Sequence, residues 1–136
     1  MKLAVAGKGG VGKTTVASLL ARIYAAESKK VIAIDADPDA NLASALGIPV
    51  EEARRITPIV ELKDLIEQRT GAKPGSTGTY FKLNPKVDDI PERFSAQKDN
   101  VRLMVMGTVK GGGTGCICPE SALLRSLLAH LLLERF

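Results

Sequence analysis

Short apolar runs alternate with longer amphipathic stretches along this chain. Runs rich in Val, Ile, Leu, Met and Ala have the length of buried strands at residues 2–6, 31–35 and 101–106. Apolar positions at helical spacing predict helices at 14–27, 61–70 and about 119–135, with a shorter one near 40–46. Because strands that alternate with helices form parallel sheets covered on both faces, the pattern predicts an α/β fold with a mainly parallel sheet.

The segment 71–100 breaks this alternation. It is rich in Gly, Pro, Ser and Thr at first and mixed in charge later. Because such a length is unusual for a connection inside a compact domain, we expect a functional insertion or a flexible flap. Tyr80 and Phe81 within it are candidates either for docking a client protein or for anchoring the loop.

Composition limits the class of protein. The chain has 136 residues, a formal charge of +4 and 45% hydrophobic residues, which suits one globular domain with a core. Much of the charge alternates in sign, as over 61–69, which is typical of a solvated helix face, so we expect no nucleic-acid partner. No signal-peptide pattern or bilayer-spanning run occurs, and we therefore expect a cytoplasmic protein without membrane association.

Residues 7–14 read GKGGVGKT and match the phosphate-binding loop pattern between a predicted strand and a predicted helix. Backbone N–H groups of such a loop surround the β-phosphate, Lys13 reaches the β/γ oxygens, and the Thr14 hydroxyl ligates Mg²⁺. We therefore predict a three-layer phosphate-loop NTPase fold that binds ATP or ADP with Mg²⁺. The predicted nucleotide-binding residues are Gly7, Lys8, Gly9, Gly10, Val11, Gly12, Lys13, Thr14 and Thr15.

Carboxylates follow the second predicted strand, where residues 35–42 read DADPDANL. The carboxyl end of a parallel strand is the usual ligand edge of an open α/β sheet, which makes Asp35 and Asp37 site candidates. The alternative is a set of solvated loop carboxylates. For Asp39 we expect only a capping role, at the helix that begins near Ala40.

The two cysteines, Cys116 and Cys118, lie just before Pro119, a residue suited to the first position of a helix. The partial positive charge of a helix N-terminus favours the metal-binding thiolate, and residues i and i+2 of an extended loop point to the same side. A pair from each of two subunits would form a Cys₄ site for Zn²⁺ or another ion that prefers thiolates. Two inert buried cysteines and a redox-sensing pair are the alternatives.

The string 8–15, KGGVGKTT, resembles the deviant phosphate-loop ATPases, the group that contains MinD, ParA and the nitrogenase iron protein. With 81–91, FKLNPKVDDIP, and 106–120, MGTVKGGGTGCICPE, the chain resembles the CooC-type accessory ATPases of carbon monoxide dehydrogenase. The resemblance covers almost the whole chain but only the first half of the family's length. We therefore expect residues 1–136 to be the N-terminal part of one phosphate-loop ATPase domain, truncated before its switch II strand.

This resemblance implies roles for individual residues. Lys8 would act in trans on the phosphates of the other subunit of an ATP-dependent homodimer, so the predicted catalytic residues are Lys8, Lys13 and Asp37. Asp37 would orient the attacking water and Asp35 would lie near Mg²⁺. Cys116 and Cys118 would bind Ni²⁺ or Zn²⁺ between subunits. The implied function is ATP-driven nickel insertion, with carbon monoxide dehydrogenase as client.

Three other functions stay open. A ParA- or MinD-like positioning ATPase would act through protein interactions without metal. An electron-transfer reductase like the nitrogenase iron protein would contribute well-separated cysteines, which a one-residue spacing argues against. A nucleotide-binding fragment without turnover is the third, because no Asp-x-x-Gly switch segment follows the loop. His130, in an apolar helix, is expected to pack rather than to ligate a metal.

Overall fold

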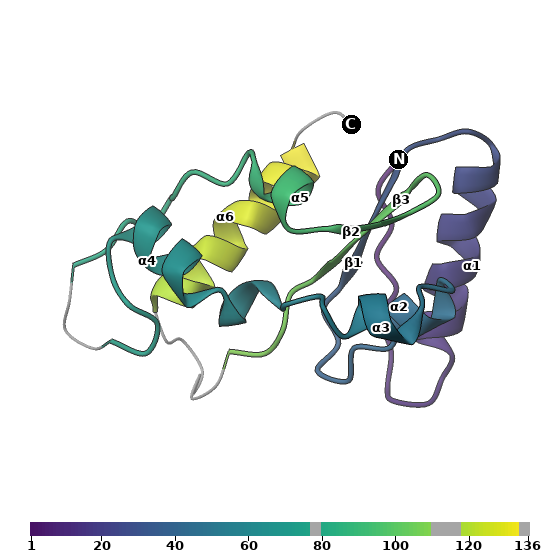
Figure 1. Ribbon diagram of the computed structural model, residues 1–136, viewed down its shortest axis with the longest axis horizontal. Coiled ribbons are helices and arrows are strands. Elements are labelled where there is room, and N and C mark those ends of the chain that lie inside the picture. The colour runs from purple at the N-terminus through teal and green to yellow at the C-terminus, as the bar shows by residue number, and fades with distance from the viewer. Residues whose placement is uncertain (77–79, 110–117, 134–136) are drawn as a thin grey trace.

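The computed structural model describes residues 1–76, 80–109 and 118–133 and has a three-layer α/β architecture (Figure 1). Its elements in chain order are α1 (Lys13–Ala26), β1 (Val31–Asp35), α2 (Leu42–Ala45), α3 (Val50–Ala53), the 3₁₀ helix η1 (Ile59–Glu61), α4 (Lys63–Thr70), α5 (Ile90–Arg93), β2 (Ala96–Lys98), β3 (Val101–Val105) and α6 (Pro119–Leu133). The predicted α/β class is confirmed. None of the described helices has the length and apolarity needed to cross a bilayer.

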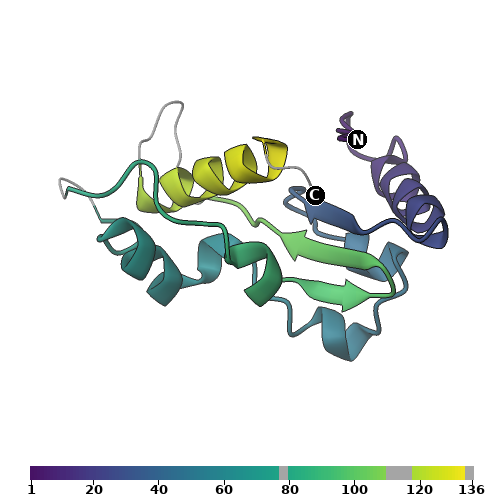
Figure 2. The ribbon, with the colours of Figure 1, turned by 90° about the horizontal axis from the view of Figure 1, so that it is seen from above.

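The sheet has the strand order β1-β3-β2, with β1 parallel to β3 and β2 antiparallel to it (Figure 2). The register pairs Val31 with Val101 and Asp35 with Val105, so β1 and β3 end side by side. Alternate residues of each strand point to opposite faces. The sheet is therefore mixed but mainly parallel along its longer pair, in agreement with the sequence prediction.

One face of the sheet packs against α1 and α2. Val101 and Leu103 of β3 share a buried cluster with Ala21 of α1 and with Leu42 and Leu46 around α2. Small side chains on α1 let the helix approach the strands closely. This face holds α1, and with it the end of the phosphate loop, against the sheet.

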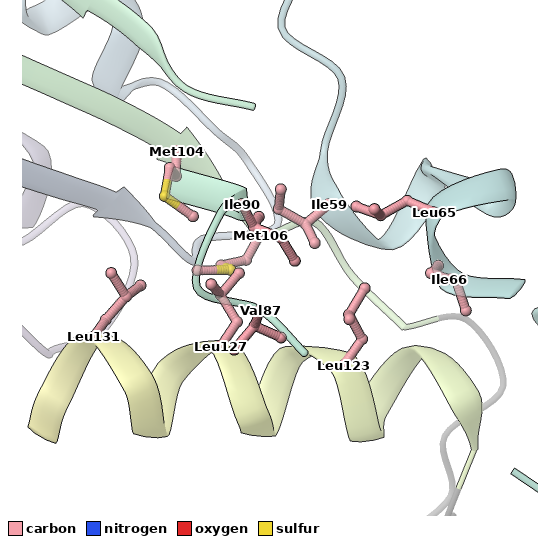
Figure 3. Packing of buried hydrophobic residues seen from close by; sticks show 10 residues of the cluster. All are labelled: Ile59, Leu65, Ile66, Val87, Ile90, Met104, Met106, Leu123, Leu127 and Leu131. Atoms are coloured by element: carbon pink, nitrogen blue, oxygen red, sulfur yellow. The ribbon is translucent and has the colours of Figure 1, made fainter. Parts of the chain in front are cut away.

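The opposite face packs against α6 (Figure 3). Leu123 and Leu127 of α6 are fully buried beside Met104, and Leu131 continues the same stripe. Ile90 of α5 also belongs to this cluster. Burying each such aliphatic side chain contributes about 1.5–3 kcal/mol, so this cluster is the main apolar core of the described chain.

Near the end of the predicted insertion, Lys86 and Asp89 are held by Arg69 of α4. Whether 71–100 is a functional insertion or a flexible flap stays a prediction. Arg69 of α4 donates two hydrogen bonds to the Asp89 carboxylate, at 2.8 and 2.7 Å. Hydrogen bonds from Arg69 and Arg93 hold the pKa of Asp89 well below its usual range. Tyr80 is fully exposed, whereas Phe81 is partly buried. The choice between docking and anchoring for these two side chains stays a prediction.

The predicted strand at 2–6 is wrong for this structure. Residues 2–6 form no strand, Leu3 is 60% exposed, and the N-terminal segment lies apart from the sheet (Figure 2). The apolar pattern is that of a strand, but a strand also needs a ladder partner. In the described part of the chain no other strand pairs with this segment, and its backbone groups stay outside the sheet.

Candidate functional site

The phosphate loop leads directly into α1, as the motif predicts. Gly12 precedes the helix in a left-handed conformation with φ +92°, and Gly10 has φ +77°. Side chains rarely adopt such angles, so glycine is required at both positions. A Cβ at either position would meet no atom within 4 Å, so the space over the loop is open there.

Lys13 turns back over this loop. Its Nζ donates to the carbonyl oxygen of Lys8 at 3.1 Å and lies 3.7 Å from Asp37 Oδ2. The Lys13 side chain is only 23% exposed. The ammonium therefore sits between the loop backbone and the carboxylate that follows β1, where an anionic ligand would replace Asp37 as its partner.

Asp35 and Asp37 organise the turn after β1. Asp35 is buried, and its two carboxylate oxygens accept the backbone N–H groups of Asp37 at 3.1 Å and Leu42 at 3.0 Å. Asp37 Oδ1 accepts the N–H of Asp39 at 2.9 Å. Asp35 thus fixes the backbone that presents Asp37, a role that sequence reasoning missed; its position near Mg²⁺ stays a prediction.

The capping role predicted for Asp39 is wrong. Helix α2 begins at Leu42, two residues later than expected, and the Leu42 N–H is satisfied by the Asp35 carboxylate. Asp39 instead accepts, through its carbonyl oxygen, a hydrogen bond from Asn41 Nδ2 at 2.9 Å. The buried Asp35 carboxylate, at the end of β1, therefore accepts the first N–H group of α2 in place of the exposed Asp39 carboxylate.

These groups line one cleft of about 350 Å³. That volume lies in the range of small-molecule sites, and the α1 N-terminus at its wall favours bound anions. The Thr14 side chain lies beside Lys13 in the lining, so the residues present fit a nucleotide phosphate group with Mg²⁺. The lining residues include Gly7, Lys13, Thr14, Ala17, Asp35, Ala36, Asp37 and Pro38.

Of the two cysteines, the structure describes Cys118, and Cys116 lies outside the described residues. Cys118 is buried and its carbonyl oxygen accepts the N–H of Ala122 at 3.0 Å, which makes it the residue before the first turn of α6. The Cys118 thiol donates to Ser121 Oγ at 3.3 Å. Among the described side chains, no group of three or more His, Cys, Asp and Glu lies close enough to hold a metal ion.

Gly107, just after β3, lies in close contact with Pro58 and Val60, a role that sequence reasoning missed. It has φ +81°, and a Cβ there would lie 2.5 Å from Val60 Cγ2 and 2.8 Å from Pro58 Cβ. A glycine after an apolar strand is a signal for such a turn, but the close approach of Pro58 comes from residues far away in the sequence. Any larger residue would displace the chain at this point.

The two regions leave the sheet from neighbouring strand ends. Asp35 closes β1, and the N–H of Met106, just beyond β3, donates to its carbonyl oxygen at 2.9 Å. One strand leads to the turn of Asp37 and the other to Gly107 and onward to Cys118. The turn that carries Asp37 and the described residues just after β3 thus leave from one hydrogen-bonded pair of strands.

Comparisons with known proteins agree with this geometry. A family model described as the CobQ/CobB/MinD/ParA nucleotide binding domain matches residues 2–130. The chain is 54% identical, over 99% of its length, to the carbon monoxide dehydrogenase accessory protein CooC of Rhodospirillum rubrum, of which it covers 51%. It is 51% identical, again over 99%, to an uncharacterized ATP-binding protein of Methanocaldococcus jannaschii, also covering 51%. The predicted resemblance is therefore confirmed.

A more distant similarity is confined to part of the chain. The chromosome-partitioning ATPase Soj of Thermus thermophilus is 50% identical over 44 residues, which are 32% of this chain. Nearly the whole chain aligns with the first two relatives, but it spans only about half of their length.

Proposed function

The chain belongs to the CobQ/CobB/MinD/ParA nucleotide-binding domain family. From this premise we propose that the protein is an ATP-hydrolysing metallochaperone. This protein dimerises with nucleotide and assists nickel insertion into carbon monoxide dehydrogenase. The observation that carries the nucleotide part is the placement of Lys13 between the loop backbone and Asp37. The similarity to CooC over nearly the whole chain supports carbon monoxide dehydrogenase as the client.

Nucleotide binding would rearrange the charges around Lys13. The β/γ oxygens take the ammonium away from Asp37, which then faces the cleft as an acceptor able to orient an attacking water. Mg²⁺, held by Thr14, would neutralise part of the phosphate charge. The left-handed conformations of Gly10 and Gly12 support this proposal, because they allow a tight loop whose backbone N–H groups can turn toward the phosphates.

Replacing Lys8 by Ala should leave ATP binding nearly unchanged, block ATP-dependent dimerisation and slow hydrolysis by about 10³-fold, the lower range for a charge supplied in trans. Lys8 is exposed on the loop and its contact with Lys13 uses only the backbone carbonyl, which Ala retains. Molar mass in solution with a non-hydrolysable ATP analogue measures the association. Lys30→Ala, an exposed lysine just before β1, is the matched control. A Lys8→Ala protein that still dimerises with nucleotide would contradict the trans role.

Cys118→Ser should remove thiol-dependent metal binding. The protein is loaded with Ni²⁺ or Zn²⁺, desalted, and analysed for metal per chain together with its molar mass. We expect half a metal ion per chain in a dimer, lost in the variant, because serine is a poor ligand for these ions. Circular dichroism controls for folding. A folded protein with ATP-dependent association and no thiol-dependent metal would favour the positioning ATPase instead, and nucleotide binding without turnover would favour the third alternative.

A further inference from the structure

The Lys13 ammonium has an anionic partner within the chain itself. Asp37 Oδ2 lies 3.7 Å from Lys13 Nζ, and the side chains of Asp37 and Lys13 are only 36% and 23% exposed. Charges at such partly shielded positions interact more strongly than charges in open solvent. Of the described residues that line this cleft, one is a cation, Lys13, and two are carboxylates, Asp35 and Asp37. The cleft that is expected to receive phosphate thus carries an excess of negative side chains.

The backbone of the turn holds the Asp37 carboxylate in place. The Asp37 N–H donates to Oδ1 of the buried Asp35 at 3.1 Å, and Asp37 Oδ1 accepts the N–H of Asp39 at 2.9 Å. Pro38 lies between these two contacts, and its ring fixes the backbone angle φ there. One carboxylate oxygen of Asp37 therefore bonds to the turn while the other, Oδ2, faces Lys13. Moving the carboxylate away from Lys13 breaks the hydrogen bond with Asp39.

A nucleotide that binds Lys13 brings its phosphate oxygens up to this fixed carboxylate. The oxygens must share the ammonium with Asp37 or displace it, and in both cases like charges meet in a cleft of reduced dielectric. One ammonium and the partial positive charge of the α1 N-terminus cannot neutralise the carboxylate and several phosphate charges together. A divalent cation on the phosphates offsets most of that excess, so the repulsion acts mainly on nucleotide without Mg²⁺.

We propose that Asp37 selects the Mg²⁺-bound form of the nucleotide, because its carboxylate repels phosphates whose charge no divalent cation offsets. This inference rests on the nucleotide-binding part of the proposed function. It gives Asp37 a role in binding that is separate from the role in hydrolysis expected of the same side chain. Asp35 is the positioning residue, since it accepts the backbone N–H of Asp37. The phosphate loop is then occupied mainly by nucleotide that already carries the cation needed for hydrolysis.

The test measures ATP affinity of the full chain by calorimetry, once with excess Mg²⁺ and once with a chelator of divalent cations. Asp37→Asn removes the charge but keeps the size of the side chain and the oxygen that accepts from Asp39. We expect this variant to bind Mg²⁺-free ATP at least about 10-fold more tightly than the wild type does, which lowers the ratio of the two affinities by the same factor. A merely structural role would weaken both affinities and leave their ratio unchanged. Asp39→Asn, an exposed carboxylate of the same turn, is the matched control and should keep the wild-type ratio.

Two results would overturn the selection by Asp37. One is a folded Asp37→Asn protein with the wild-type ratio of affinities; the protein would still bind ATP, and the proposed function would stand without this role. The other is a wild-type protein that binds no ATP in either condition, which removes the nucleotide part of the proposed function as well. If circular dichroism shows that Asp37→Asn does not fold, Asp37→Ser also removes the charge and keeps an oxygen for the Asp39 N–H. A wild-type ratio in that variant would refute the proposal equally.

Discussion

Lys13→Ala is expected to weaken ATP binding by at least about 100-fold, because a hydrogen bond to a charged group contributes about 1.5–3 kcal/mol and Lys13 offers more than one. The ammonium already stands at the loop, held by the carbonyl oxygen of Lys8 and by Asp37, so binding exchanges Asp37 for the phosphates as its partner. Isothermal titration calorimetry with ATP and Mg²⁺ measures the change in ATP affinity. Alanine cannot replace the charge or the donors.

The Lys13→Ala variant should fold as the wild type does. The Lys13–Asp37 pair is partly exposed and its atoms are 3.7 Å apart, so its loss costs little stability. Lys63→Ala, at the exposed start of α4, controls for the loss of one positive charge. Unchanged ATP affinity in a folded Lys13→Ala protein would refute the assignment of this loop as the phosphate site.

Leu127→Ala is expected to lower the free energy of unfolding by about 2–5 kcal/mol, the range for a buried leucine whose removal leaves a cavity. Leu127 is fully buried in the middle of α6, among side chains from the sheet and from the segment before α5 (Figure 3). Urea unfolding measures the loss as a lower midpoint at an unchanged slope.

Leu132→Ala on the same helix is the matched control. Leu132 is 60% exposed, so the same deletion should change stability by no more than about 0.5 kcal/mol. The pair separates burial from helix propensity, since both substitutions introduce the same residue into α6. Equal losses in the two variants would show that the face of α6 against the sheet is not the one described.

Local patterns predicted the helices and the longer strand pair well. Helices α1 and α6 lie within one or two residues of their predicted starts because a glycine loop and Pro119 mark them. Elements that depend on distant partners were missed or wrong. Strand β2 has only three residues and exists through its pairing with β3, while segment 2–6 has a strand pattern and no strand to pair with.

The same contrast between local patterns and contacts with distant segments holds for the site. The loop and Lys13 could be predicted because one short motif contains the whole phosphate cradle. The role of Asp35 could not, since its capping of Leu42 depends on where the chain returns after the turn. The role of Gly107 could not either, since it depends on the position of Pro58. Each of these is a property of packing between segments rather than of a spacing.

The hydrogen bond from Met106 to the carbonyl of Asp35 has a consequence for the proposed cycle. This bond joins the ends of β1 and β3, so under the proposed cycle a displacement of the turn that carries Asp37 would also act on Met106 and Gly107, just after β3. Thermodynamic linkage makes such an effect reciprocal: if bound ATP alters metal affinity by some factor, bound metal alters ATP affinity by the same factor. The loading state of the cysteines could then be read from an ATP titration alone, without any assay for metal.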